Sequence, residues 1–218
     1  INVSPLRGSG AAITGKGTSS GPVSFMRAAD AIAGSIKSGG KTRRAAKMVI
    51  MNADHPDIYE FIWVKANINK QLKELAKLGY DVSLNSSIYQ NAAFQNANQS
   101  VRVDDEFMRF ATYEIRNHQA DLLESIAEAA WECGDPGIQF HDTINVMNTT
   151  PNAGEIVASN PCSEYMHINN SACNLGSLNL IKFINEDRSF DIERINIPDV
   201  GMFLTQVDNT SNETLGVL

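Results

Sequence analysis

The fold and the chemistry of the chain are both predicted from Ser159-Asn160-Pro161-Cys162-Ser163-Glu164, in which a thiol stands two residues from an amide and two from a carboxylate. Side chains at alternate positions of an extended or tightly looped segment point the same way, so these three groups can converge on one small substrate. A carboxylate can take a proton, an amide can bind a hydroxyl, and a thiol can give up a hydrogen atom or a proton. The trio therefore suits chemistry on a diol such as ribose.

A second thiol, Cys173, follows eleven residues after Cys162. A metal site built from the two cysteines with His141 and His167 is one alternative, but the thiol spacing is not C-x-x-C and the histidines lack ligand periodicity. A cysteine hydrolase is another, and it would need a positioned histidine base for which the sequence shows no signature. Neither alternative explains the amide and the carboxylate beside Cys162.

Composition indicates a globular protein of a reducing compartment. The 218 residues suffice for one sizeable core or a large part of a bigger domain, and 43% are hydrophobic. No apolar run approaches membrane-spanning length, and residues 1–5 show no signal-peptide pattern. The three cysteines have no disulfide-framework spacing. We therefore expect a cytoplasmic protein with no membrane contact.

Charge argues against a nucleic-acid partner. The net charge is −7 and the pI is near 5.1, whereas phosphate backbones reward clustered lysine and arginine. One basic cluster at residues 41–47 stands out and suits the phosphate of a single nucleotide. A solvated basic face is the alternative for this cluster.

Hydrophobic periodicity predicts helices and strands in alternation, which is typical of an α/β fold. A helix is expected over residues 22–37 and a strand over 47–51. The next helix begins near Ile58, with Asp54 as its cap and His55 as part of the cap. We expect a separate polar helix over residues 70–78, ended by glycine.

The second half of the chain continues the alternation. A strand is expected to end near residue 103, with Asn98 and Ser100 facing a polar cavity, and acids at 104–106 lead into a helix. A helix over 121–133 carries Cys133 on its apolar face as a small buried hydrophobe. A short strand at 138–140 and a turn-rich excursion precede the cysteine loop.

The motif Asn-Pro-Cys-x-Glu, followed by Ala-Cys-Asn-Leu-x-Ser-Leu-Asn-Leu, resembles the active-site finger loop of the ribonucleotide reductase catalytic chain. Residues 21–27 and 37–46 are most similar to the adenosylcobalamin-dependent (class II) branch, and the matches keep the same order over most of the chain. The resemblance implies part of the ten-stranded α/β barrel with a central finger loop at 158–166. Residues 1–187 would belong to this barrel domain, and 188–218 have no assignment.

The resemblance also implies an activity, the reduction of ribonucleoside di- or triphosphates to 2′-deoxyribonucleotides for DNA synthesis. Adenosylcobalamin would generate a thiyl radical on Cys162, Glu164 would act as general base, and Asn160 would bind the substrate hydroxyls. Cys173 would be one of the two reducing thiols. Its partner is expected upstream of residue 1, and Cys133 does not replace it.

Further site residues and partners are implied by the same resemblance. Ser159, Asn160 and Asn98 would line the substrate site. Residues 8–46 would hold the effector loops, which bind deoxynucleotide effectors through Arg7, Lys16, Arg43 and Arg44. The helix between these loops would lie at a homodimer interface, and a thioredoxin-type protein would be the reductant.

Two features depart from the resemblance. The connection after Tyr113 is shorter than in the family, and the later barrel strands and the C-terminal cysteine tail are missing. We therefore expect an incomplete active site. The alternatives are a class I large subunit, which needs a separate radical-generating subunit, and a non-catalytic nucleotide-binding or dimerisation fragment.

Overall fold

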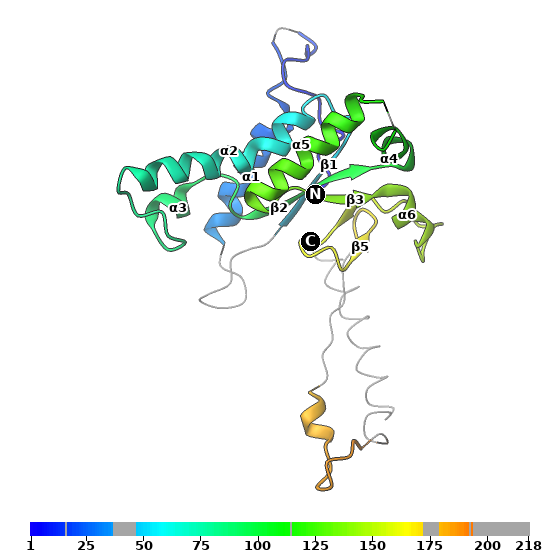
Figure 1. Ribbon diagram of the computed structural model, residues 1–218. Coiled ribbons are helices and arrows are strands. Elements are labelled where there is room, and N and C mark those ends of the chain that lie inside the picture. Colours follow the sequence, from blue (N-terminus) through cyan, green and yellow to red (C-terminus); the bar gives the residue numbers. More distant parts are fainter. Residues whose placement is uncertain (16, 37–46, 114, 172–178, 192, 194–218) are drawn as a thin grey trace. The chain divides into compact units, whose positions relative to one another are not determined.

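The computed structural model describes residues 1–15, 17–36, 47–113, 115–171, 179–191 and 193 (Figure 1). The chain forms two compact units, Ile1–Asn169 and Asn170–Leu218. The described part of the second unit contains a short 3-10 helix, η1 (Leu180–Phe183), and a β-bridge between Ile184 and Phe190. All other elements belong to the first unit.

A parallel sheet is the centre of the first unit. Its strands are β1 (Lys47–Asn52), β2 (Ala97–Val103) and β3 (Gly137–Phe140), in the spatial order β1-β2-β3. The N-terminus adds a short parallel bridge between Asn2 and Ile50 at the β1 edge. Strands that are joined by helical segments and run parallel confirm the predicted α/β class.

The main hydrophobic core lies between this sheet and three helices, α1 (Gly21–Ser35), α2 (Ile58–Lys77) and α5 (His118–Cys133), which Figure 1 shows stacked beside the strands. Alternate strand residues enter this core. They meet the large side chains of α2 and α5 in one cluster: Val49, Met51, Val101, Val103, Phe61, Ile62, Leu122 and Ile126. Burial of each such side chain stabilises the folded state by roughly 1.5–3 kcal/mol. This core therefore holds the sheet and the helices together.

Helix α2 differs from the prediction in two ways. It is one helix of 20 residues rather than two, because the buried face continues through Ala66 and Leu72 and no glycine or proline interrupts it. Asp54 does not cap it; the N-cap position belongs to Asp57. The expectation for His55 is confirmed, since its Nδ1 accepts the backbone N–H of Asp57 at 3.0 Å.

The remaining helices are short. These are α3 (Ser87–Asn91), α4 (Asp105–Ala111) and α6 (His141–Val146). The acids before α4 behave as predicted, since the Asp104 carboxylate accepts the N–H of Phe107 at 2.7 Å. No pattern in the sequence predicts α6, which occupies part of the segment expected to be turns.

Helix α5 confirms the strongest helical prediction but begins three residues early, at His118, because Asn117 caps it through the N–H of Ala120. It ends at Gly134, whose φ of +83° is a conformation that favours glycine. Cys133 is partly buried and packs against the core, as expected. Among the described helices, none has both the length and the apolar character needed to cross a membrane.

Candidate functional site

The predicted finger loop is a closed turn between two short antiparallel strands, β4 (Ala158–Ser159) and β5 (Met166–His167). Asn160 closes the turn three times. Its N–H donates to the carbonyl of Tyr165 (3.1 Å), its carbonyl accepts the N–H of Ser163 (3.0 Å), and its Oδ1 accepts the N–H of Tyr165 (3.0 Å). The segment is therefore tightly looped rather than extended.

Two of the three chemically active groups are exposed at this turn. Cys162 and Glu164 face solvent, whereas Asn160 is half-buried and uses its Oδ1 within the loop. Ser163, between the two exposed residues, has a left-handed φ of 62°. Its hydroxyl lies 3.3 Å from the Oγ of Ser159. The turn thus presents the thiol and the carboxylate outward, and convergence of the trio on a substrate stays a prediction.

Side chains of the parallel sheet attach the loop to β2 and β3. Asn98 of β2 is exposed and its Nδ2 donates to the carbonyl of Pro161 at 3.2 Å. Ser159 is buried, and its Oγ accepts from Nε2 of Gln139 at 2.7 Å and donates to the carbonyl of Asn160 at 2.9 Å. Asn98 therefore lies next to the finger loop and Ser159 lies within it. Both side chains bind the loop itself, and their role in a substrate site stays a prediction.

Sequence reasoning missed the buried arginine behind this attachment. Arg102 of β2 donates Nε to Nδ1 of His141 (2.8 Å), Nη1 to Oε1 of Gln139 (3.2 Å) and Nη2 to the carbonyl of Ile156. His141 in turn contacts a carboxylate oxygen of Glu155 at 2.9 Å. Burial lowers the pKa of the Arg102 guanidinium, and the nearby carboxylates of Glu155 and Asp142 raise it.

A sequence signal for this network exists. Asn98, Ser100 and Arg102 alternate along β2 and so share the face that turns away from the main hydrophobic core. Gln139 stands between two apolar residues of β3. A polar row on a mostly buried strand indicates internal partners, because buried polar groups are hydrogen-bonded in native proteins.

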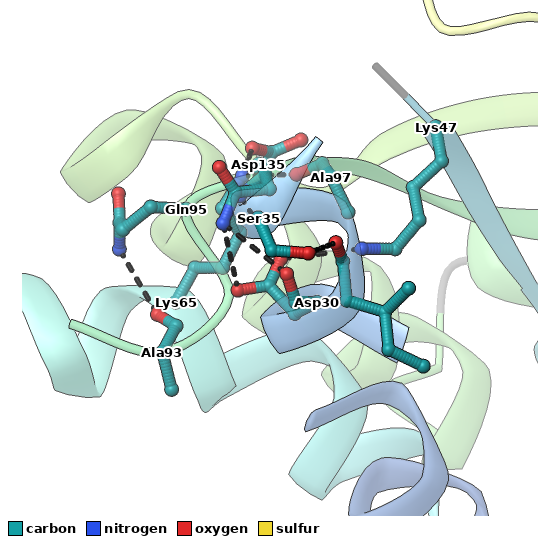
Figure 2. Close-up of polar contacts among 10 residues, drawn as sticks. Asp30, Ser35, Lys47, Lys65, Ala93, Gln95, Ala97 and Asp135 are labelled. Atoms are coloured by element: carbon teal, nitrogen blue, oxygen red, sulfur yellow. Dashed lines mark hydrogen bonds and ion pairs between the residues drawn. The ribbon is translucent and has the colours of Figure 1, made fainter. Parts of the chain in front are cut away.

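A second polar network ties α1 to the start of β1 and β2 (Figure 2). Asp30 of α1 is 3% exposed, and its carboxylate contacts Nζ of Lys47 at 3.3 Å and accepts the N–H of Asn96 at 2.9 Å. Nearby, Lys65 of α2 pairs with Asp135 and donates to the carbonyl of Ala97 at 2.7 Å. This network holds the strand that follows the predicted second effector loop.

The predicted effector residues are only partly described. Arg7 is exposed and donates Nη1 to the carbonyl of Ala12 at 2.6 Å, within a small hairpin closed by a bridge between Ala12 and Thr18. The hairpin rests on α2, because the Asp57 carboxylate accepts the N–H of Ser9 at 2.8 Å. Three predicted effector residues and one predicted catalytic thiol lie outside the described residues: Lys16, Arg43, Arg44 and Cys173.

A cavity of about 470 Å³ opens where the parallel strands end, the edge at which open α/β sheets usually bind ligands. Its walls include Asn52, Arg102, Asp104 and His141 together with the aromatic rings of α4. Within the described ranges, no three histidine, cysteine or acidic side chains are grouped to hold an ion. The alternative metal site includes Cys173, which lies outside those ranges.

A sequence model of the ribonucleotide reductase barrel domain matches residues 1–114 and 111–212. The chain belongs to the ribonucleotide reductase family. The resemblance and the α/β barrel class predicted from the finger loop are thereby confirmed. The match reaches residue 212 and so includes most of the segment for which the sequence offered no assignment.

Named relatives come from the B12-dependent branch. A vitamin B12-dependent ribonucleotide reductase of Streptomyces clavuligerus is 49% identical over 212 residues, covering 89% of this chain and 22% of the relative. One from Rhodopirellula baltica is 46% identical over 233 residues, covering 98% and 22%. A vitamin B12-dependent ribonucleoside-diphosphate reductase of Thermoplasma acidophilum is 37% identical over 180 residues, covering 83% and 22%. The chain thus spans about a fifth of the length of these relatives.

The two matched ranges of the reductase domain meet at residues 111–114, in the connection between α4 and α5. The shortened connection expected at this place from the sequence stays a prediction. Asn117, the N-cap residue of α5, donates Nδ2 to the carbonyl of Phe110 in α4 at 2.7 Å.

Proposed function

We propose that this chain is part of the catalytic subunit of a vitamin B12-dependent ribonucleotide reductase, which converts ribonucleotides to 2′-deoxyribonucleotides in the cytoplasm. One observation carries the proposal: the thiol of Cys162 and the carboxylate of Glu164 are exposed together on a turn whose N-terminal side is hydrogen-bonded to the parallel sheet at Ser159 and Pro161. Relatives that are 46–49% identical and named B12-dependent reductases support the choice of branch over a class I large subunit.

The proposed chemistry uses these two residues in one step. A thiyl radical at Cys162 takes the 3′ hydrogen atom of the ribose while Glu164 accepts the proton of the 3′ hydroxyl. The 2′ hydroxyl leaves as water, and two thiols, of which Cys173 is one, supply the two electrons and become a disulfide. Cys162 recovers its thiyl form when the hydrogen atom returns to C3′, so the net reaction consumes one dithiol.

Adenosylcobalamin would supply the radical equivalent when bound. The exposed sulfur of Cys162 fits this requirement, because it can be reached from outside the sheet without opening the core. The residues around Cys162 would keep the site in place. Asn160 closes the turn, Glu164 presents its carboxylate, and Asn98 binds the Pro161 carbonyl.

The remaining partners are part of the same proposal. Deoxynucleotide effectors would bind the loops before and after α1, and a thioredoxin-type protein would reduce the disulfide. A homodimer would form through α1 and its C-cap residue Ile36, which expose apolar side chains: Phe25 is 58%, Ile32 62% and Ile36 50% exposed. Exposed apolar patches of this kind mark interaction surfaces.

The test uses the full-length polypeptide that carries this chain, supplied with adenosylcobalamin, a dithiol and each ribonucleotide in turn as diphosphate and triphosphate. We expect deoxyribonucleotide formation without any second subunit, and complete loss of it in Cys162→Ser with an unchanged melting temperature. Residual turnover in Cys162→Ser would refute the radical role. A strict need for a second subunit would assign the chain to class I.

A non-catalytic fragment is the second candidate, because the chain spans 22% of the length of its relatives. Residues 1–218 alone would then bind a deoxynucleotide effector or dimerise but reduce nothing. Intact mass of the natural protein separates the cases: a mass well above 23.8 kDa supports the enzyme, and a matching mass supports the fragment.

A further inference from the structure

A line of three hydrogen-bonded side chains connects the middle of the sheet to the loop that carries Cys162. Arg102 and Gln139 are register partners on β2 and β3, and they are 4% and 3% exposed. The Gln139 amide is used at both ends: Oε1 accepts from Arg102, and Nε2 donates to Oγ of Ser159 at 2.7 Å. Ser159 is 3% exposed, so this line is shielded from solvent throughout.

Ser159 contacts the chain on both sides of Cys162, at Asn160 and at Ser163. Its Oγ donates to the carbonyl of Asn160 at 2.9 Å and lies 3.3 Å from the hydroxyl of Ser163. Asn160 and Ser163 flank Pro161 and Cys162, and the backbone is closed by the bond from the Ser163 N–H to the Asn160 carbonyl. A shift of Ser159 therefore moves the thiol with it.

The guanidinium decides the direction of every bond in the line. Arginine donates only, so the Gln139 oxygen must face Arg102 and its NH₂ must face Ser159. The Ser159 oxygen then accepts from Gln139, which leaves its one proton for the Asn160 carbonyl. Burying an arginine costs free energy unless its N–H groups are hydrogen-bonded. We therefore expect Arg102, Gln139 and Ser159 to keep their mutual hydrogen bonds together.

We propose that Arg102 and Gln139 are positioning residues that set where the Cys162 thiol lies during reduction. The inference rests on the proposed function, and neither residue is catalytic, because both act through Ser159. Asn98 provides a further attachment from the sheet to the loop, through one exposed bond to the Pro161 carbonyl. Reduction requires close placement of the reacting atoms, and a misplacement of about 1 Å can cost about 100-fold in rate.

The test compares Gln139→Leu with Gln95→Leu in the full-length holoenzyme. The first variant removes both hydrogen bonds of the Gln139 side chain, to Arg102 and to Ser159, and keeps a side chain of similar volume. The second makes the same replacement at a glutamine whose Nε2 donates only to the neighbouring Ala93 carbonyl at 3.2 Å. We expect kcat to fall about 10- to 100-fold in Gln139→Leu with KM within about twofold. Gln95→Leu should match the wild type.

Two further measurements separate positioning from general damage. Hydrogen exchange of the Asn160, Ser163 and Tyr165 amides, measured without cofactor, should be about tenfold faster in Gln139→Leu while α5 amides are unchanged. Ser159→Ala should lower kcat similarly, and the double variant should be no worse than either single one, because both break one line. If Gln139→Leu does not fold, Gln139→Glu, which keeps an acceptor for Arg102 but no donor for Ser159, takes its place.

The outcomes are distinct for the two proposals. Normal kcat and normal loop exchange in Gln139→Leu, multiplicative losses in the double variant, or accelerated exchange throughout the protein would overturn the positioning role. A wild-type protein without reductase activity would overturn the proposed function, while the exchange comparison would still decide whether Gln139 fixes the loop.

Discussion

At the scale of single residues, the Asn160 side chain has two roles, one in the structure of the turn and one in the proposed reaction. Its Oδ1 accepts the N–H of Tyr165 and so closes the turn. The proposed reaction needs the NH₂ group of the same amide to hold a substrate hydroxyl. An amide meets both demands, because it accepts at one end and donates at the other.

Two substitutions at Asn160 separate these demands. Asn160→Asp keeps the acceptor, so we expect an intact turn but a fall in kcat/KM of about tenfold or more, from the lost donor to substrate. Asn160→Ala loses both and should also speed hydrogen exchange of the Tyr165 amide. Kinetics and amide exchange on the same preparations measure the two effects. Equal activity in Asn160→Asp and the wild type would exclude the substrate contact.

At the scale of elements, the buried ion pair between Asp30 and Lys47 joins α1 to the beginning of β1. The side chains are 4% and 13% exposed, and the same carboxylate accepts the N–H of Asn96 just before β2. One carboxylate thus holds a helix against the starts of two parallel strands. The predicted second effector loop lies between α1 and β1 in the sequence, so this joint links the two elements that precede and follow it.

Asp30→Asn should therefore destabilise the protein substantially. It leaves the Lys47 ammonium partly buried without its counter-charge, which typically costs about 3–5 kcal/mol. Glu74→Gln is the matched control, because its partner Lys77 and Glu74 itself are exposed and such pairs contribute little. Thermal unfolding of the two variants should show a clear decrease for the first and almost none for the second. Similar melting temperatures would mean that the joint is not structural.

The N-terminal cap of α5 gives another prediction at this scale. Asn117 accepts the N–H of Ala120 and donates to the carbonyl of Phe110, so it both starts the helix and closes the connection from α4. Asn117→Ala should lower the free energy of unfolding by about 1 kcal/mol or more. Asn117→Asp keeps the cap and should recover part of that loss in denaturant titrations. No recovery would place the main contribution in the bond to Phe110.

How far the sequence predicts each element depends on whether its signal is local. Strand β1, helix α1 and the body of α5 follow from apolar periodicity and glycine stops, which are local. The continuity of α2 does not, because its polar middle stays helical through tertiary packing of Ala66 and Leu72. The role of Arg102 needs the register that pairs it with Gln139, and no pattern within one strand specifies the residue opposite.

At the scale of the whole molecule, the outer surface of α1 exposes large apolar side chains that the fold itself does not cover. The helix buries Val23, Met26 and Ala33, and the first two belong to the main core cluster. Its other side exposes Phe25 and Ile32, whose spacing of seven residues puts them on one face, and the C-cap residue Ile36 directly after the helix is exposed too. A helix of a globular protein normally directs polar residues to solvent, so this apolar stripe of exposed side chains favours a covered surface in the assembled protein.

Phe25→Glu and Ile32→Lys should each weaken the proposed homodimer, because either one buries an unpaired charge if the two α1 helices meet. Arg27 is also exposed on α1, and Arg27→Gln serves as a control that changes charge without placing one in the stripe. Sedimentation of the full-length protein over a concentration series should show a dissociation constant raised at least about tenfold for the stripe variants. Unaltered sedimentation with normal folding would remove α1 from the interface. Loss of effector binding together with the dimer would place the effector loops at that interface, since the predicted loops begin and end at this helix.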